Sequence, residues 1–225
     1  MTYSLENVVP WGRTLDEYAT FFALTDDDLK KSIIGCGDGP ASFNMEATAR
    51  GTRVVSCDPI YAFNADAIRQ RIDETYPVIM AQTAAHQEQF LWNHYKTLDN
   101  LANIRMQAMR RFLEDYRDGP SRYIASALPD LPIVSDSFDL ALSSHFLFLY
   151  SEQLDLDFHQ RSVDEMLRVA REVRIFPLLD LTVQTSSHLE PIMTTLGQRG
   201  YHCQIETVRY EFQRGGNKML RITRS

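Results

Sequence analysis

Three glycines alternate with other residues in the segment Gly35-Cys36-Gly37-Asp38-Gly39, which directly follows the apolar pair Ile33-Ile34. Glycine has no Cβ, so it reaches positive φ without strain and leaves room for a bound molecule against the main chain. An apolar strand that runs into such a turn is typical of a site where backbone lies against a ligand. The spacing of the glycines predicts a ligand-binding turn, but it does not by itself identify the ligand.

The residues after the glycine turn predict a short helix and a second strand. Pro40 suits the first helical position and Gly51 suits the residue just past a helix end, which predicts a helix over 41–50. The next segment, Arg53–Asp58, is a β-branched strand that ends in an acid. Strand, glycine turn, helix, strand and acid form a βαβ nucleoside-binding unit, in which Asp58 would accept hydrogen bonds from ribose hydroxyls.

Two classes of cofactor use this arrangement. A nicotinamide or flavin dinucleotide needs a third glycine for close packing of the helix on the strand, and this chain has Pro40 at that place. S-adenosylmethionine has no pyrophosphate to bind at the helix N-terminus and needs only the close approach of the turn. The segment Gly35–Gly39 resembles the first motif of class I S-adenosylmethionine-dependent methyltransferases.

A second segment carries the same resemblance. Leu131–Ser143 is similar to the family's segment leading into its fourth strand, and the run Phe146–Tyr150 is similar to that of bacterial proteins labelled only as methyltransferases. The likeness covers the chain from about Ser32 to the C-terminus, interrupted by one helical insert. It implies an α/β fold with a Rossmann-like seven-stranded sheet, mostly parallel with a C-terminal antiparallel hairpin, helices on both faces, and the insert after the second strand.

The resemblance also implies roles for individual residues. The three glycines would pass under the methionine part of S-adenosylmethionine, with Asp38 placed for its amino group or for shaping the turn, and Asp58 would bind the ribose. The family often has an acid followed by an alanine at the place that receives the adenine amino group, and this chain has Ala127 and Leu128 there. Backbone groups or Ser126 would therefore bind the adenine amino group instead. The expected cofactor-binding residues are Gly35, Cys36, Gly37, Asp38, Gly39, Asp58, Pro59, Ile60, Ala127, Leu128, Ser143 and Arg13.

Two further residues are candidates for roles that depend on charge or proton transfer. His145 follows the fourth strand, where the family faces the methyl group and the acceptor, and its imidazole is the candidate general base. Methyl transfer is driven largely by holding the reactants together, so the alternative is a site with no dedicated base. Arg13 could clamp the cofactor carboxylate through its planar guanidinium, or lie exposed without a partner.

Composition limits the partners of the chain. With 225 residues and 44% hydrophobic content, one domain spanning residues 1–225 is expected. A net charge of −7 disfavours nucleic acid as a substrate. Cys36, Cys57 and Cys203 lack paired metal spacing, and Asp155–His159 is expected to cap a helix rather than bind a metal, so no metal site is predicted. Without a signal or a membrane-spanning run, the expected location is the cytoplasm.

The elements that must position these residues follow from periodicity and capping patterns. Thr14 and Glu17 form a capping box that opens a helix over the cofactor mouth. The region 62–120 shows helical spacing and no clear strand, which predicts two or three helices that form a lid over the acceptor, or only core or a homodimer contact. Three further strands are predicted at Arg122–Ser126, Phe138–Ser143 and Val173–Leu179. One helix is predicted from the capping box Ser162/Glu165 to Arg171, and another from the capping box Ser187/Glu190 to its stop at Gly200. The chain is predicted to close with a hairpin of Cys203–Glu211 and Met219–Thr223 around a turn at 214–217.

These observations favour a methyltransferase that uses S-adenosylmethionine and a small or medium organic acceptor. Two alternatives stay open: a catalytically silent S-adenosylmethionine-binding module, and a nicotinamide-dependent oxidoreductase on a similar sheet. The C-terminal hairpin favours S-adenosylmethionine as the cofactor, because the dinucleotide-binding fold usually lacks an antiparallel pair of strands at the end of its sheet. It would also serve simply to protect a sheet edge.

Overall fold

A single seven-stranded sheet forms the centre of the computed structural model, which describes residues 9–119 and 121–224. The strand order is β3-β2-β1-β4-β5-β7-β6, and β7 is antiparallel to both β5 and β6 while the other pairs are parallel. The expected fold class is therefore confirmed. The strands are β1 Ser32–Cys36, β2 Arg53–Cys57, β3 Tyr123–Ile124, β4 Phe138–Ser144, β5 Ala170–Phe176, β6 Tyr201–Thr207 and β7 Lys218–Arg224.

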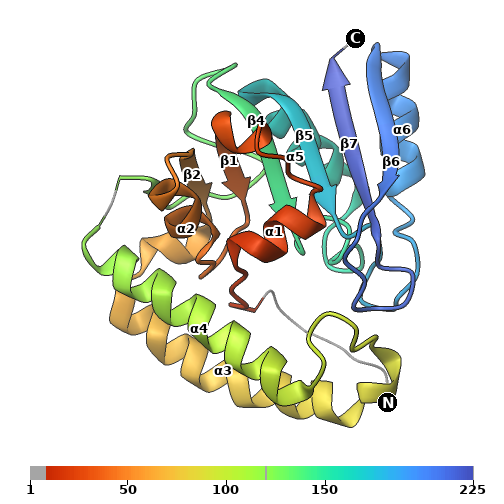
Figure 1. Ribbon diagram of the computed structural model, residues 1–225. Helices are drawn as coiled ribbons and strands as arrows, with labels where there is room; N and C mark the ends of the chain where they lie inside the picture. The colour runs from red at the N-terminus through yellow and green to blue at the C-terminus, as the bar shows by residue number, and fades with distance from the viewer. Residues whose placement is uncertain (1–8, 120, 225) are drawn as a thin grey trace.

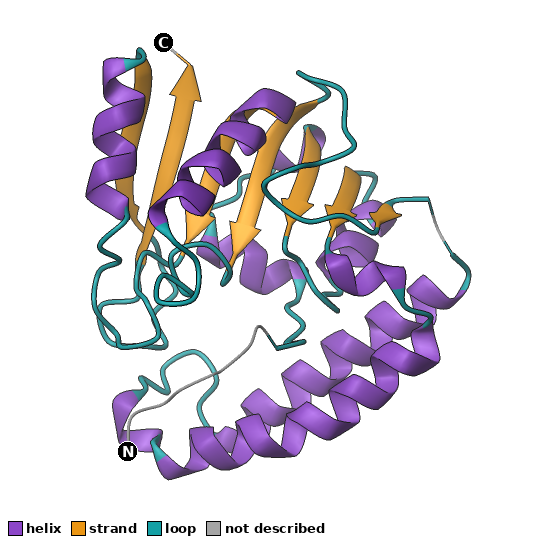
Figure 2. Ribbon diagram, turned by 180° about the vertical axis from the view of Figure 1, so that it is seen from behind, coloured by secondary structure: helices purple, strands orange, loops and turns teal. Residues whose placement is uncertain are grey.

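Helices cover both faces of the sheet, and a helical pair lies across one of its edges (Figures 1 and 2). None of the described helices is long and apolar enough to cross a bilayer. The helices are α1 Leu15–Phe21, α2 Phe43–Ala49, α3 Ala65–Ala85, α4 Leu98–Arg117, α5 Leu156–Val169 and α6 Leu189–Gln198, with short 3₁₀ turns η1 Asp28–Lys30, η2 Pro59–Ala62 and η3 Gln87–Gln89.

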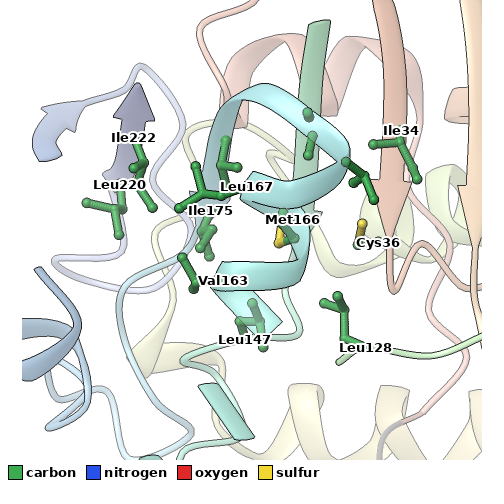
Figure 3. Packing of buried hydrophobic residues seen from close by; sticks show 14 of the residues in the cluster. Ile34, Cys36, Leu128, Leu147, Val163, Met166, Leu167, Ile175, Leu220 and Ile222 are labelled. Carbon is green, nitrogen blue, oxygen red and sulfur yellow. The ribbon is translucent and has the colours of Figure 1, made fainter. Parts of the chain in front are cut away.

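The alternation of side chains along the strands divides the core into two layers. Successive residues of a strand point to opposite faces, so Ile33 and Ile34 of β1 enter different clusters. Ile34 packs in a cluster with Val163 and Met166 of α5 (Figure 3). Ile33 packs in a cluster with Tyr18 of α1 and with α2. Burial on both faces explains why Ile33–Ile34 of β1 and Leu140–Leu142 of β4 are uninterrupted apolar segments.

The strands that follow β1 in the chain are added first on one side of it, as β2 and β3, and then on the other side, beginning with β4. The strand order therefore reverses between β1 and β4. In open α/β sheets, ligands bind outside the carboxyl ends of the strands at such a reversal, because the crossovers leave in opposite directions and open a crevice. The residues that follow β1, β2 and β4 therefore converge on one place. The glycine turn, Asp58 and His145 all belong to these segments.

The predicted insert after the second strand is present as a long helical hairpin. Helices α3 and α4 contact each other and lie across the carboxyl edge of the sheet (Figure 1). Asn64 and Thr97 cap the two helices by accepting hydrogen bonds from the main-chain N–H groups of Ala67 and Asn100. Pro120, at the end of the predicted insert, lies outside the described residues.

Two of the three predicted capping boxes are wrong, while one is confirmed. The Thr14/Glu17 capping box is present at α1. Helix α5 begins at Leu156, because Asp155 accepts a hydrogen bond from the N–H of Phe158 at 2.8 Å. The capping box expected at Ser162/Glu165 therefore falls inside the helix, where Ser162 is buried. Helix α6 begins after His188 with no side-chain cap, so the capping box expected at Ser187/Glu190 is absent.

Strand ends also differ from the sequence prediction. Strand β5 runs from Ala170 to Phe176 and stops at Pro177, which has no N–H to donate to a neighbouring strand. Strand β3 is only two residues long. Strands β6 and β7 pair as expected, but residues 208–217 connect them as a long loop rather than a tight turn. Helix α2 begins at Phe43, so Pro40 is not its first residue.

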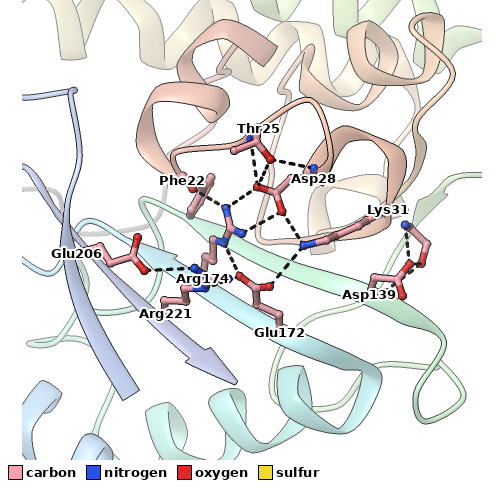
Figure 4. A network of polar contacts seen from close by, with 10 residues as sticks. Phe22, Thr25, Asp28, Lys31, Asp139, Glu172, Arg174, Glu206 and Arg221 are labelled. Carbon is pink, nitrogen blue, oxygen red and sulfur yellow. Dashed lines mark hydrogen bonds and ion pairs between the residues drawn. The ribbon is translucent and has the colours of Figure 1, made fainter. Parts of the chain in front are cut away.

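A buried ionic network joins η1 to β5 on the face that α1 covers (Figure 4). The Arg174 guanidinium binds both carboxylate oxygens of Asp28, at 3.0 and 3.1 Å, and Glu172 through Nε at 2.7 Å. Lys31 adds a second contact to Asp28 at 2.6 Å. Such a geometry compensates the cost of burying the charges only while all partners remain.

We therefore expect Asp28→Ala to lower the free energy of unfolding by about 3–5 kcal/mol, because Arg174 is left buried without its main partner. Urea unfolding of the purified variant measures this. The matched control is Asp27→Ala, which removes a pair with Lys30 whose side chains are 87% and 75% exposed, and its effect is expected to stay below about 1 kcal/mol. Equal effects of the two variants would contradict the prediction.

Candidate functional site

A cavity of about 430 Å³ opens at the carboxyl edge of the sheet. The segments that follow β1, β2, β3, β4 and β5 form one side of it, and α3, α4 and the β6–β7 loop form the other. The volume lies within the range of small-molecule sites. Most of the expected cofactor-binding residues line it, namely Arg13, Gly37, Asp38, Gly39, Asp58, Pro59, Ile60, Ala127 and Leu128.

Each glycine of the turn has a separate steric reason. Gly37 and Gly39 have φ of +77° and +56°, a region that other residues rarely adopt. A Cβ on Gly37 would also lie 3.0 Å from the ring of Phe146. A Cβ on Gly35 would lie 1.9 Å from the carboxylate of Asp38. Gly35 and Cys36 belong to β1 and lie beneath the cavity rather than in its wall.

Asp38 joins the turn to its two neighbouring elements. Its carboxylate accepts hydrogen bonds from the Tyr18 hydroxyl of α1 at 2.7 Å and from the Ser56 hydroxyl of β2 at 2.6 Å. Burial raises the pKa of Asp38 from 3.8 to about 6, and the nearby charge of Asp58 adds to that rise. Of the two roles predicted for Asp38, shaping the turn is the one that these contacts support.

Asp58 lies at the end of β2 and faces the same turn. One carboxylate oxygen accepts from the Gly39 N–H at 2.8 Å, and the other accepts from the Ile60 N–H at 2.9 Å. Each oxygen keeps a further lone pair for a ligand hydroxyl. Burial raises the pKa of Asp58, while the two N–H groups oppose this by stabilising the anion. Tyr61 fixes the turn from the other side by donating to the Gly39 carbonyl at 2.7 Å.

The segment after β3 offers one polar group. Ala127 and Leu128 line the cavity with apolar surface, and Ser126 lines it between them and β3. The Ser126 hydroxyl oxygen is buried and has no hydrogen-bond partner among the described residues, apart from the Cys57 thiol whose pKa it lowers. A buried hydroxyl without a full set of partners is a natural contact for a ligand.

Arg13 lies beside the cavity with its guanidinium 5.8 Å from the ring centroid of Phe21. Its Nε is buried without a hydrogen-bond partner, and within residues 9–119 and 121–224 no carboxylate lies within ion-pair distance of it. A buried cationic donor in this state is stabilised by an anion. The end of the glycine turn passes close by, since a Cβ on the neighbouring Gly12 would lie 2.3 Å from the Pro40 carbonyl oxygen.

His145 directly follows β4 and is held from several directions. Its main chain has φ of +54°, and its N–H donates to the Phe176 carbonyl at 2.6 Å. The ring packs edge-on against Phe21 and Phe176, with centroids 4.9 and 5.3 Å away. Burial lowers the pKa of His145 well below its usual value, and the charges of Arg13 and Arg105 act in the same direction. The imidazole is therefore neutral near pH 7.

The serine in the cavity wall is Ser144 rather than Ser143. Ser144 lines the cavity beside His145 and forms a hydrogen bond of 2.9 Å with its Nδ1. Ser143 is fully buried, does not line the cavity, and its hydroxyl has no partner among the described residues. Alternation along β4 places the two serines on opposite faces of the sheet.

Sequence reasoning missed a buried polar cluster behind this site. Arg105 of α4 binds both oxygens of Glu17, at 2.6 and 2.7 Å, and both residues are almost fully buried. The hydroxyl of Tyr95 bonds to both Glu17 and Arg105, and the hydroxyl of Tyr210 lies 3.0 Å from it. The signal was present in the sequence, because Arg105 falls on the apolar stripe of its helix with Leu101, a position that a charged residue takes only when it is paired.

Metal chemistry has no candidate site in the described part of the chain, where no group of three or more His, Cys, Asp or Glu side chains is arranged to hold an ion. The free thiols of Cys36 and Cys57 lie at the adjacent ends of β1 and β2, and burial raises the pKa of both.

Comparison with known proteins identifies the family. No family model matches the chain. The chain is 33% identical over 222 residues, 98% of both chains, to a protein of the archaeon Methanocaldococcus jannaschii named Uncharacterized protein MJ0045. The chain belongs to the same family as this protein. The relative is archaeal, whereas the resemblance seen in the sequence was to bacterial proteins.

Solved structures identify the fold. Magnesium protoporphyrin IX methyltransferase from Synechocystis PCC 6803, crystallised with bound S-adenosylmethionine, matches 94% of this chain and 78% of its own at 11% identity and a TM-score of 0.50. A methyltransferase from Aquifex aeolicus matches 92% of this chain and 87% of its own at 11% identity, and its TM-score of 0.44 adds nothing to the first match. The chain has the class I methyltransferase fold.

The raised pKa of Asp38 predicts how stability changes with pH. The native carboxyl holds its proton more tightly than the unfolded chain does, with a pKa of about 6 against 3.8, so the free energy of unfolding falls as pH rises from about 4 to about 6. The contribution is roughly 3 kcal/mol. Asp38→Asn should flatten this slope in urea unfolding at a series of pH values, whereas the exposed control Asp66→Asn should retain it. An unchanged slope in Asp38→Asn would contradict the assignment.

Proposed function

We propose that this protein is an S-adenosylmethionine-dependent methyltransferase that acts on a small or medium organic acceptor. The observation that supports this proposal most directly is that the main chain of Gly37 and Gly39, which has no side chains, lies beside the Asp58 carboxylate. Both line a cavity at the point where the strand order reverses. The bound S-adenosylmethionine of the Synechocystis enzyme, which shares the fold, supports the choice of cofactor.

The residues of the cavity fit that cofactor group by group. The glycine turn would lie against the methionine part, and Asp58 would accept from the ribose hydroxyls with the lone pairs that its two N–H partners leave free. Pro59, Ile60 and Leu128 offer apolar surface for an adenine ring. The unsatisfied hydroxyl of Ser126 is the proposed contact for the adenine edge.

The methionine carboxylate would complete the contacts of Arg13. The Nε of Arg13 is buried without a partner in the described structure, and Arg13 lines the same cavity as Gly37 and Gly39. A planar guanidinium binds a carboxylate through two parallel hydrogen bonds. Gly35, Cys36 and Ser143 would support the site from beneath, since they form the strand ends on which the cavity rests.

The far end of the cavity is suited to an apolar acceptor. Aromatic and aliphatic side chains line it from the β4–α5 loop, the segment after β5 and the β6–β7 loop, and α3 covers it. Among the described lining residues, Asp38 and Asp58 are the acids, and both lie at the cofactor end. An uncharged or anionic acceptor therefore fits better than an ammonium group. The apolar far-end residues are Phe90, Leu149, Pro177, Leu181 and Phe212.

The helical insert would act as a lid over this acceptor. Arg105 of α4 and Glu17 of α1 form a bidentate pair buried between the insert and the sheet domain. The pair fixes one end of the lid, while the residues of α3 that line the cavity remain opposite the sheet. The rival role, a contact between two copies of the chain, has no specific observation in its favour.

Calorimetric titration with S-adenosylhomocysteine tests the proposed function. We expect the wild type to bind, and Asp58→Ala to bind about tenfold to over a hundredfold more weakly, because a charge-assisted hydrogen bond to a ribose contributes about 1.5–3 kcal/mol. Asp58→Asn keeps an acceptor oxygen for the turn and separates loss of charge from loss of the turn. Asp66→Ala, with a carboxylate that is 82% exposed, is the control that should bind normally.

The same measurement separates the alternatives. Titration with NADH should give no heat of binding, and binding of NADH in place of S-adenosylhomocysteine would make the nicotinamide-dependent reading correct. Absence of S-adenosylhomocysteine binding by the folded wild type would remove the methyltransferase proposal. Binding without turnover on any acceptor of the apolar class would instead favour a silent binding module.

A further inference from the structure

Strand β6 forms one edge of the sheet (Figures 1 and 2). It has seven residues, whereas β3 at the opposite edge has two. Proteins commonly prevent an edge strand from pairing with another chain by keeping it short or by placing proline or lysine on it. The sequence of β6, Tyr201–Thr207, contains neither residue. This edge therefore lacks the usual protection against pairing.

The outward main-chain groups of β6 belong to alternate residues. The N–H of Val208 donates to the Asn217 carbonyl at 2.8 Å, so Val208 points toward the β7 side. The pairing of β6 with β7 is one-to-one, so the same orientation recurs at every second residue. The outward N–H and C=O groups are those of Tyr201, Cys203, Ile205 and Thr207. Within residues 9–119 and 121–224, no main-chain hydrogen bond from outside the β6–β7 pair reaches these groups.

The side chains of these outward residues lie on one face of the strand. Tyr201 and Cys203 pack against the core cluster to which α6 belongs. Ile205 follows on the same face, but 43% of its surface is exposed. In an antiparallel pair of two β6 strands centred on Gln204, Ile205 of each copy lies opposite Cys203 of the other. The exposed apolar surface of Ile205 is then covered.

The other face of β6 carries two groups of complementary charge. His202 is exposed, and Glu206 is half-buried beside Arg221, whose Nη1 lies 3.4 Å from its Oε1. Centring the pair on Gln204 places His202 of each copy opposite Glu206 of the other. An imidazole can donate a hydrogen bond to a carboxylate across the strands, and cross-strand pairs of this kind stabilise a sheet.

We infer that two copies of this chain associate through β6, as antiparallel neighbours centred on Gln204, so that their sheets join into one. Each outward residue of one copy donates one hydrogen bond to the other copy and accepts one. Both the charge pair and the apolar pair are made by the strand with itself, as a two-fold axis requires. A second copy of the chain therefore fits this edge better than an unrelated strand does.

Helix α6 is compatible with this arrangement. The helix packs on β6 and has no charged residue from Pro191 to Gln198. The outer side of a surface helix normally carries charged side chains. A two-fold axis perpendicular to the sheet places the α6 helices of both copies on the same face, where like charges would repel. The exposed residues of this uncharged stretch are Pro191, Thr194, Thr195, Gly197 and Gln198.

The pairing leaves both cavities accessible. Because the two-fold axis reverses the direction of the strands, the carboxyl edges of the two sheets lie on opposite sides of the joined sheet. The loop that follows β6 carries Tyr210 and Phe212 of the cavity wall. Association through β6 therefore holds the strand from which this wall departs without covering the cavity itself.

Sedimentation velocity of the purified full chain at tens of micromolar tests the inference. We expect a particle with twice the mass of one chain. Ile205→Pro removes an outward N–H that makes no bond to β7, and Ile205→Lys places a charge against Cys203 of the other copy, so both variants should sediment as monomers. Val134→Lys, which alters an apolar side chain that is 80% exposed elsewhere on the surface, is the control and should remain dimeric.

A disulfide between the two copies tests the register. Gln204→Cys in a Cys203→Ser background should form a disulfide-linked dimer on mild oxidation, because the two copies of residue 204 face each other with Cα atoms about 4.5 Å apart. His202→Cys in the same background is the matched control. Its two copies are offset by roughly 13 Å along the strands, so it should not cross-link.

Three results would overturn the inference. The first is a monomeric wild type at these concentrations, and the second is a dimer that persists in Ile205→Lys, which keeps the main chain of β6 intact even if Ile205→Pro does not fold. The third is cross-linking of native Cys203 with itself while Gln204→Cys does not cross-link. None of these measurements involves S-adenosylhomocysteine, so the association and the proposed function are tested separately.

Discussion

The carboxylate of Asp38 occupies the space in which any side chain at Gly35 would lie, and the rest of the site depends on this close contact. The contact lets the chain reverse immediately after β1 while the carboxylate reaches Tyr18 of α1 and Ser56 of β2. Three elements are thereby fixed around one buried charge. The main chain of Gly37 and Gly39 is left exposed to the cavity as a consequence.

A second buried charge fixes the opposite wall. Glu17 closes the capping box of α1 and, with the same carboxylate, binds Arg105 of the insert. Burial of Glu17 is compensated by this guanidinium, which lowers its pKa to about 2. Helix α1 therefore carries one contact to the glycine turn, through Tyr18, and one to the lid, through Glu17. Its seven residues connect the two walls of the cavity.

The sequence was sufficient where a local pattern has a single physical meaning. The alternating glycines, the acid that ends β2 and the Thr14/Glu17 box each describe a contact between near neighbours, and the structure contains the turn, the strand end and the cap. The pairs Ser162/Glu165 and Ser187/Glu190 match the same capping pattern yet do not cap, because Asp155 begins α5 earlier and α6 begins one residue later than the pattern requires, after His188. A capping pattern therefore predicts that a helix is near without fixing the residue at which it begins.

Contacts between segments far apart in the chain could not be predicted from a single sequence. Nothing local to Arg105 indicates that its partner is Glu17, or that Ser144 rather than Ser143 faces the cavity, since the second choice depends on the register of β4 against β1 and β5. The length of the insert was visible, whereas its position across the carboxyl edge depends on contacts with distant segments, among them the pair of Arg105 with Glu17. Recognition of the glycine turn therefore located the cavity without specifying its far wall.

The same strand order that opens the cavity also places both His145 and Asp38 in its wall. Strands β1 and β4 are neighbours, so the segments that leave their carboxyl ends lie side by side, and the Phe146 ring packs over Gly37. Tyr18 of α1 bonds to Asp38 in the glycine turn, while Phe21 of the same helix packs against the ring of His145 after β4. One short helix therefore contacts both segments, which it could not do if another strand separated β1 from β4. The shared wall of the cavity is thus a consequence of topology, and it requires that α1 crosses the sheet at the reversal of strand order.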